Sequence, residues 1–384
     1  TYGIAGGHTF GYIYPGPIGI PWTAEVHGLD KAAFAHLCVS CGLCKEICPV
    51  DINIPMMIAK VKEEDVQENG QLVANDFFMA SETLAKLASA TAPVSNWLLR
   101  RGATRAVMQS LVGVDKRRTL PAFSRKRLRS RLAPLGMGSG EAGRVVFFPD
   151  VYADYNDPEL GVRAVKILIA LGYKVVVPKL RWSGMPYISY GGISKATAVA
   201  KENLESLKPY LEQGCSVVST EPTAVYMLRE VYPTLVPGEV AEKSREMSFP
   251  FFGFIQGRLA DLGLRPAFPT EEAIGFHIPC HERSVSGGRP AIDFLAAAGY
   301  EVQVVENGTC CGMAGTFGMK HGDLGYNLSM EVWDHLFRLL RESGRKLVAT
   351  ESSVCSMQIS DGVGVKVVHP LRAVEELSSR RQSS

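Results

Sequence analysis

The chain has 384 residues, of which 46% are hydrophobic and 21% are charged. At about 100–200 residues per domain, this length allows two or three packed domains, and the composition excludes a disordered, collagen-like or coiled-coil protein. The net charge of +2 provides no field that would attract nucleic acid or a bulk membrane surface. No apolar run approaches the about 20 residues that a membrane-spanning helix requires. Any partner must therefore be inferred from individual sites.

The amino-terminal third is predicted to begin with an ordered segment that lacks regular secondary structure and wraps around another part of the protein. Helices are predicted to follow it. The chain opens on Thr1 without an initiator methionine, which indicates a fragment or a processed product whose targeting signal would lie upstream. Residues 1–35 are rich in Gly and Pro and show neither a helical nor a strand period. A helix is expected over 54–68, with Pro55 in its first turn, and further helices are expected over 72–113.

A basic segment separates these helices from the rest of the chain. Between Asp115 and Arg131, eight side chains are basic and one is acidic. Two interpretations stay open at this point. The segment is either a solvated linker between domains or a surface that docks an acidic partner or lipid headgroups.

After Gly143 the pattern changes to short β-branched strands that alternate with amphipathic helices. This alternation predicts an α/β fold with a mostly parallel sheet. The expected strands are 145–148, 174–178 and 216–220, and the expected helices are 160–171 and 194–212.

The α/β region contains an internal repeat at an offset of about 130 residues. Residues 147–150 pair with 277–280, and Thr220-Glu221 pairs with Thr350-Glu351. We therefore expect two copies of one α/β unit. The cysteines occur only in the second copy, because Asp150 stands where Cys280 does, Val225 where Cys355 does, and the loop 187–192 where Cys310-Cys311-Gly312 does.

The first cysteine group has the spacing Cys38-x2-Cys41-x2-Cys44-x3-Cys48-Pro49. This spacing is typical of a [4Fe–4S] cluster, and in two-cluster ferredoxins the fourth cysteine ligates the other cluster. A zinc site is the alternative, but four cysteines within eleven residues do not easily surround one tetrahedral ion. The motif resembles that of bacterial ferredoxins. The resemblance implies a second motif, which this chain lacks and which would end just before Thr1.

The second cysteine group consists of Cys280, Cys310-Cys311 and Cys355. Each cysteine lies at or just past the end of a predicted strand, so parallel strands would bring them to one crevice. Glycines flank the adjacent pair, as expected where the backbone approaches a bulky ligand, and Gly312 would supply the tight turn by taking a positive φ. Buried free thiols or disulfides are the alternatives, and neither explains adjacent cysteines in a Gly-rich loop.

The pattern Cys280…Cys310-Cys311-Gly312…Cys355 resembles the cysteine-rich CCG domain of iron–sulfur oxidoreductases. Such domains occur in the glycolate oxidase iron–sulfur subunit, the C component of anaerobic glycerol-3-phosphate dehydrogenase, FAD-linked D-2-hydroxyacid dehydrogenases, lactate-utilisation proteins and heterodisulfide reductase. The resemblance implies an α/β plus α fold with two duplicated CCG-type units. The expected domains are a helical ferredoxin-like [4Fe-4S] domain (1–113), a basic linker (114–142), a degenerate unit (143–245) and a cluster-binding unit (272–375).

The chain departs from this family at one cysteine position. The family pattern ends in Cys-x2-Cys, whereas Gln358 follows Cys355 here. Four thiolates remain, which suffice for a cubane. His277 and His281 flank Cys280 and are candidates to donate to cluster sulfurs or to carry a proton. Cys215 stands alone and is expected to be a core thiol.

The resemblance implies an electron-transfer component of a flavin-dependent 2-hydroxyacid dehydrogenase of the glycolate or lactate type. The chain shows no Gly-x-Gly-x-x-Gly fingerprint, so FAD is expected on a partner subunit or an upstream fused domain. Electrons would pass to a quinone or another acceptor, in the cytoplasm or at the inner face of the membrane. One alternative is heterodisulfide-reductase-like thiol chemistry at the second cluster, and another is a structural zinc protein.

Overall fold

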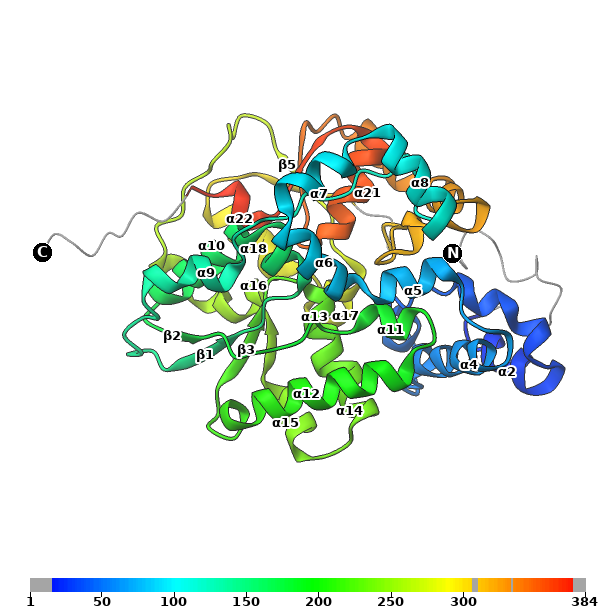
Figure 1. The fold of residues 1–384 in the computed structure, drawn as a ribbon. Helices are drawn as coiled ribbons and strands as arrows, with labels where there is room; N and C mark the ends of the chain where they lie inside the picture. The colour runs from blue at the N-terminus through cyan, green and yellow to red at the C-terminus, as the bar shows by residue number, and fades with distance from the viewer. Residues whose placement is uncertain (1–15, 306–309, 333, 376–384) are drawn as a thin grey trace, which may run out of the picture.

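The computed structural model describes residues 16–305, 310–332 and 334–375 (Figure 1). Within these ranges, no helix is long and apolar enough to cross a membrane. The described amino-terminal residues form helices joined by loops, as expected for 54–68 and 72–113. Its helices are α2 (Gly19–His27), η2 (Leu29–Leu37), α3 (Leu43–Glu46), α4 (Ile54–Asn69), α5 (Val73–Met79), α6 (Ser81–Ala90), α7 (Ala92–Leu99) and α8 (Gly102–Val112).

The prediction for residues 1–35 is wrong over the part that the structure describes. α2 and the 3-10 helix η2 occupy this part, separated by Gly28 at a φ of 94°. Residues 16–18 form the turn before α2, and the residues beyond them accept helical geometry. Ile20 and Ala35 pack with Ile58 of α4 in one apolar cluster. The rest of the expected wrap, residues 1–15, lies outside the described residues.

The first sheet has four parallel strands in the order β2-β1-β3-β4. Val145 pairs with Val175, and Val146 pairs with Val217. The strands carry continuous apolar runs because both faces of a parallel sheet are covered. β4 lies beyond residue 245, the expected end of the first copy. The strands are β1 (Arg144–Phe147), β2 (Lys174–Val176), β3 (Ser216–Ser219) and β4 (Ser248–Pro250).

The helices around the first sheet follow its strands in chain order, and the expected helices 160–171 and 194–212 are both present. They are η4 (Tyr152–Asn156), α10 (Pro158–Ala170), α11 (Met185–Ser189), α12 (Ile193–Leu211), α13 (Pro222–Tyr226), η5 (Met227–Val231), α14 (Tyr232–Leu235), α15 (Glu239–Met247), α16 (Phe251–Ile255) and η6 (Gln256–Asp261).

The second sheet is also parallel and has the corresponding order β6-β5-β7-β8. Its strands are β5 (Ile274–Phe276), β6 (Val302–Val304), β7 (Leu347–Ala349) and β8 (Lys366–Val368). The helices are α17 (Cys280–Ser286), α18 (Arg289–Ala297), η7 (Phe317–Met319), η8 (Asp323–Asn327), α19 (Leu328–Val332), α20 (Asp334–Glu342), α21 (Ser353–Val363) and α22 (Pro370–Ala373).

One apolar core joins the two sheets. Phe147 of the first sheet and Phe276 of the second belong to the same buried cluster, together with side chains of α10, α16 and α18. The neighbouring strand residues point the other way, as the alternation of a strand requires: Val146 packs in a second cluster with α12, and Val348 in a third with α20 and α21. The sheets are therefore fixed relative to one another.

The basic segment is solvated only in part: six of its eight basic side chains are exposed, but other parts of it pack into the protein. Asp115 and Arg118 are completely buried, and Leu128 of α9 (Leu128–Leu132) joins the shared core, just before η3 (Ala133–Leu135). Other basic side chains of the segment form ion pairs within the chain, such as Arg127 with Asp154 and Arg131 with Glu159. The segment therefore binds the helical part to both sheets.

Candidate metal centre

The first cysteine group lies on a compact turn between η2 and α4, with Cys44 on the short helix α3. Three residues of this turn have positive φ values, Ser40 at 51°, Gly42 at 81° and Asp51 at 52°. A Cβ atom at position 42 would lie 2.8 Å from the ring of Tyr226. Glycine is therefore required there both for the backbone conformation and for the close approach.

Backbone N–H groups donate to two of the sulfur atoms in this turn. The N–H of Ser40 lies 3.5 Å from Sγ of Cys38, and the N–H of Ile52 lies 3.4 Å from Sγ of Cys48. Hydrogen bonds of this kind stabilise a thiolate and tune the reduction potential of a cluster that it holds.

The thiols of the first group lie close enough to influence each other's ionisation. Burial and the neighbouring Cys38 raise the pKa of Cys44 to about 11. Burial raises the pKa of Cys41 still further, and the next contribution comes from Cys280 of the second group. Cys41 and Cys44 are therefore protonated at neutral pH without a counter-charge, so binding of a metal centre by them must release protons.

The structure brings the four cysteines of the second group together. Cys280 begins α17 after β5, Cys310 and Cys311 follow β6, and Cys355 lies on α21 after β7. The thiols lie close enough for each to shift the pKa of the next, in the order Cys280, Cys310, Cys311, Cys355. Because β6, β5 and β7 are adjacent in the sheet, their carboxyl ends place all four thiols at one edge, as predicted from the sequence.

The loop of the adjacent cysteines has the predicted turn. Gly312 adopts a φ of 91°, and its N–H lies 3.4 Å from Sγ of Cys310. Ala314 and Gly315 also have positive φ values, 49° and 64°. The tight turn exposes backbone donors toward the sulfur atoms, as in the first group. Gly308, another glycine of this loop, lies outside the described residues.

The two groups adjoin each other. Cys41 and Cys280 pack against the apolar cluster that contains Cys310, Cys311 and Cys355. His281 links the two groups, which are far apart in the sequence, because its Nε2 donates to the carbonyl oxygen of Ser40 at 3.0 Å.

His281 is held in one tautomer by its partners. Because Nε2 donates to a carbonyl oxygen, Nδ1 accepts from the hydroxyl of Thr223, 2.9 Å away. Its ring also stacks on Tyr226, with the ring centroids 4.5 Å apart. Burial lowers its pKa to about 4, so the imidazole is neutral at pH 7. In this structure, therefore, the His281 imidazole orients the first loop through Ser40, and both of its ring nitrogens are occupied by Thr223 and Ser40.

His277 is completely buried at the end of β5. Its Nδ1 lies 3.3 Å from the hydroxyl of Thr350, and within the described ranges its Nε2 has no hydrogen-bond partner. Burial lowers its pKa to about 4. The predicted proton-carrying role of this side chain stays a prediction.

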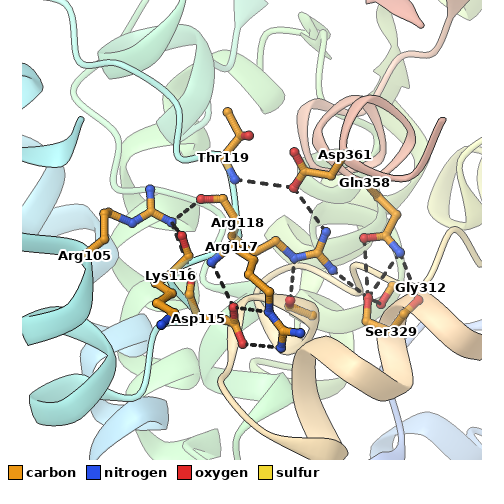
Figure 2. Close-up of polar contacts among 11 residues, drawn as sticks. Arg105, Asp115, Lys116, Arg117, Arg118, Thr119, Gly312, Ser329, Gln358 and Asp361 are labelled. Atoms are coloured by element: carbon orange, nitrogen blue, oxygen red, sulfur yellow. Dashed lines mark hydrogen bonds and ion pairs between the residues drawn. The ribbon is translucent and has the colours of Figure 1, made fainter. Parts of the chain in front are cut away.

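The sequence did not indicate the network that holds the cysteine-pair loop (Figure 2). The buried Arg118 donates from Nε to the carbonyl oxygen of Gly318 at 2.6 Å and from Nη2 to Oγ of Ser329 at 2.9 Å. The Ser329 hydroxyl in turn donates to the carbonyl oxygen of Gly312 at 2.9 Å. A side chain from the basic segment thus fixes the turn that carries Cys310 and Cys311.

Gln358, which stands where the family pattern has its last cysteine, belongs to the same network. Its side chain is completely buried, and Nε2 donates to the carbonyl oxygen and Oγ of Ser329 at 3.0 and 3.1 Å. The amide at this position therefore supports the loop.

The sequence also did not indicate a buried lysine beside the first group. Lys62 of α4 is completely buried, and its Nζ donates to the carbonyl oxygens of Cys38 at 2.7 Å and Ser189 at 2.9 Å. Lys62 lies four residues after Ile58 and therefore on the apolar stripe of α4. This spacing is the feature of the sequence that could have indicated its burial. Burial lowers the pKa of Lys62, and burial together with Lys62 lowers that of Lys320 to about 8.

The donor set of both groups fits an iron–sulfur cluster, which cysteine thiolates hold. In the ranges that the structure describes, no three His, Cys, Asp or Glu side chains form a group that could hold a metal ion. The four thiols of the second group lie at the ends of three adjacent strands. A polynuclear cluster, in which different thiolates bind different irons, suits such a set of ligands.

The edge of the first sheet that corresponds to the second cysteine group contains no cysteine. Asp150 follows β1 there and accepts hydrogen bonds from the N–H and hydroxyl of Ser183 at 3.1 and 2.7 Å. Val225 is buried in α13. Cys215 is buried in the core of this sheet, as predicted.

Comparison with known proteins agrees with this geometry. Residues 274–360, which span β5 to α21, match the family model of the cysteine-rich domain CCG. The chain carries a CCG cysteine-rich domain. Cys280, Cys310, Cys311 and Cys355 all lie within it.

The chain is similar to known oxidoreductase components over most of its length. It is 27% identical to the C component of anaerobic glycerol-3-phosphate dehydrogenase of Escherichia coli (strain K12), over 84% of this chain and 81% of that protein. It is 22% identical to D-2-hydroxyglutarate dehydrogenase of the same organism, over 88% of this chain but 34% of that protein. It is 23% identical to the B component of fumarate reductase (CoM/CoB) of Methanothermobacter marburgensis, over 88% and 61%. The names of these relatives are those of dehydrogenases and reductases or of their components.

Proposed function

We propose that this chain is the electron-transfer component of a flavin-dependent 2-hydroxyacid dehydrogenase of the glycolate or lactate type. It would take electrons from FAD on a partner subunit or fused domain and pass them to a quinone or another acceptor. The observation that carries this proposal is the junction of two cysteine groups, with Cys41 beside Cys280 in one buried apolar cluster. Iron–sulfur clusters, when bound, accept and release single electrons over a wide range of potentials.

The residues of the chain prepare two sites for such clusters. Cys38, Cys41, Cys44 and Cys48 would hold one [4Fe–4S] cluster, and the second cysteine group would hold the other. Cys310, Cys311 and Cys355 are at most 4% exposed, so the apolar surroundings exclude water from the second site. Backbone N–H donors at Ser40, Ile52 and Gly312 stabilise the thiolates. All nine cysteines are free thiols, which supports a reducing, cytoplasmic location.

We also propose that the fold is a ferredoxin-like helical domain followed by two duplicated CCG-type units. The identical strand order of the two sheets supports the duplication. Asp150 and Cys280 occupy corresponding positions after β1 and β5, which supports the inference that the first unit has lost its metal site.

Thiol chemistry of the heterodisulfide-reductase type is less well supported. A disulfide substrate would have to approach the second site directly, but three of its four thiols are buried. Gln358 also fills the position that a further ligand would leave open, through its hydrogen bonds to Ser329.

The proposal is tested by metal analysis and electron paramagnetic resonance of anaerobically reconstituted protein. We expect about eight irons per chain, from two clusters of four, and negligible zinc. Signals of both clusters should appear on reduction with dithionite and disappear when a water-soluble quinone is added. Cys41→Ser should remove about four irons, whereas the core variant Cys215→Ser should retain them all. Stoichiometric zinc, or iron that does not react with the quinone, would refute the relay.

A further inference from the structure

Helices α7 and α8 present apolar side chains to solvent. On α7, Val94, Trp97 and Leu98 are 60%, 54% and 40% exposed, and their spacing places them on one stripe of the helix. On α8, Val107 and Leu111 are 55% and 69% exposed and are one helical turn apart. The two helices pack against each other on the outside of the molecule (Figure 1). We call these five side chains the α7–α8 face.

The charged side chains on α7, on α8 and on their connection have one sign. Between residues 83 and 114 the sequence contains no Asp or Glu. Arg100 and Arg101, which connect the two helices, are exposed, and the guanidinium of Arg101 lies 4.5 Å from the ring centroid of Trp97. Lys116 is exposed just beyond α8. An apolar stripe edged by cations complements a surface that is apolar inside and anionic outside.

The neighbouring side of α8 faces the protein interior. Met108 and Val112 pack against the apolar cluster that includes Cys310, Cys311 and Cys355. The helix that carries part of the α7–α8 face thus borders the apolar cluster of the second cysteine group.

We propose that the α7–α8 face docks on the surface of an anionic lipid membrane. Val94, Trp97, Leu98, Val107 and Leu111 enter the boundary between headgroups and acyl chains, where an aromatic ring with a neighbouring cation is favoured, and Arg100 and Arg101 contact lipid phosphates. This inference rests on the proposed function in one respect: the quinone that accepts electrons would be held in the membrane on which the protein docks. Docking itself needs no electron transfer.

Vesicle sedimentation with the reconstituted full chain tests the inference. We expect co-sedimentation with vesicles of phosphatidylcholine and phosphatidylglycerol, weaker binding to phosphatidylcholine alone, and a decrease as salt screens the arginines. Since burial of a large apolar side chain favours transfer by about tenfold or more, the double variant Trp97→Gln/Leu111→Gln should bind at least about tenfold more weakly. Val26→Gln, which changes a side chain of α2 that is 52% exposed, is the matched control and should bind like the wild type.

Iron content and size-exclusion light scattering, measured on the same samples, separate the possible failures. Vesicle binding that Trp97→Gln/Leu111→Gln leaves intact, or no binding by the wild type, would overturn the docking proposal even if the iron signals and quinone reactivity are as expected. A wild-type dimer that the double variant dissociates would show that a second copy covers the face, which also overturns it. Normal docking by a protein without redox-active iron would instead refute the proposed function and leave the docking face standing.

Discussion

The two sheets have corresponding strand orders, but they use the carboxyl ends of their strands differently. In the second sheet this edge collects four thiols, supported by Gly312 and by the Arg118 network. In the first sheet the corresponding positions hold Asp150, bonded to Ser183, and a loop whose Tyr190 hydroxyl contacts Thr316 at 2.7 Å. Tyr190 packs in the same apolar cluster as Cys310 and Cys311. The loop of the first half that carries Tyr190 thus packs beside the cysteine-bearing loop of the second half.

The turn at Gly312 is the feature of the second edge with the largest expected effect. Gly312→Val would place a β-branched side chain at a φ of 91°, which costs about 1–2 kcal/mol for any left-handed residue and more for a branched one. We expect the loop to lose its cluster, so that iron falls from about eight to about four per chain while the first cluster persists.

Gly214→Val is the matched control, because Gly214 has a φ of 75° in the first sheet's half of the molecule and open space around its Cα. This variant carries similar backbone strain without contact to a cysteine. Full iron content in Gly312→Val would show that the loop does not enclose a cluster.

Arg118 allows a test of the support behind the second edge. Arg118→Met would leave the carbonyl of Gly318 and the mostly buried Asp361 without their cationic partner. Removal of one member of a buried ion pair costs about 3–5 kcal/mol, so the free energy of unfolding in urea should fall by that amount and iron should be lost from the second site first. Arg125→Met, in the same segment but exposed, should change neither quantity. Equal stability of the two variants would contradict the network.

The sequence allowed most of the α/β region to be predicted, because β-branched runs and helical periods are local signals. Strands β1 to β3 and helices α10 and α12 lie within a few residues of their expected positions. The meeting of Cys280, Cys310, Cys311 and Cys355 followed from the rule that parallel strands end at one edge.

Features that depend on distant partners could not be predicted. Arg118 is buried against Gly318, Ser329 and Asp361. These partners lie about two hundred residues or more away in the chain, so no local pattern around Arg118 indicates its burial. The same holds for His281, which bonds to Ser40. In both cases the sequence shows only a polar side chain, whose default expectation is exposure to solvent.

Glu221 in the first half and Glu351 in the second occupy corresponding positions. Glu221 offers a pH-dependent test of the packing between the two halves. Burial and the neighbouring Asp150 raise the pKa of Glu221 to about 8, against hydrogen bonds from Ser353. The folded protein therefore holds a proton that the unfolded chain, with an ordinary glutamate pKa near 4.5, releases. Stability should fall as pH rises from about 4.5 to about 8.

Glu221→Gln keeps the acceptor oxygen and removes the titration. Its melting temperature should exceed that of the wild type at pH 8 and approach it at pH 5, because Gln resembles the protonated acid. Glu205→Gln, an exposed change, should follow the wild type at both values. Parallel pH profiles of Glu221→Gln and the wild type would show that Glu221 is ionised in the folded protein.

The smallest expected effect concerns the contact of Tyr190, in the first half, with the cysteine-bearing loop of the second half. Tyr190→Phe keeps the ring that packs on Phe78 and removes only the hydrogen bond to Thr316, an interaction worth about 0.5–1.5 kcal/mol. We expect a loss of unfolding free energy of that size, unchanged iron content, and an unchanged paramagnetic signal of the second cluster, because the hydroxyl supports the loop through Thr316 and contacts no sulfur. If Tyr190→Phe instead shifts that signal or releases iron, the first half does more than pack against the cysteine-bearing loop. Tyr190 would then hold the second site directly, and the two edges would form one site built from both sheets.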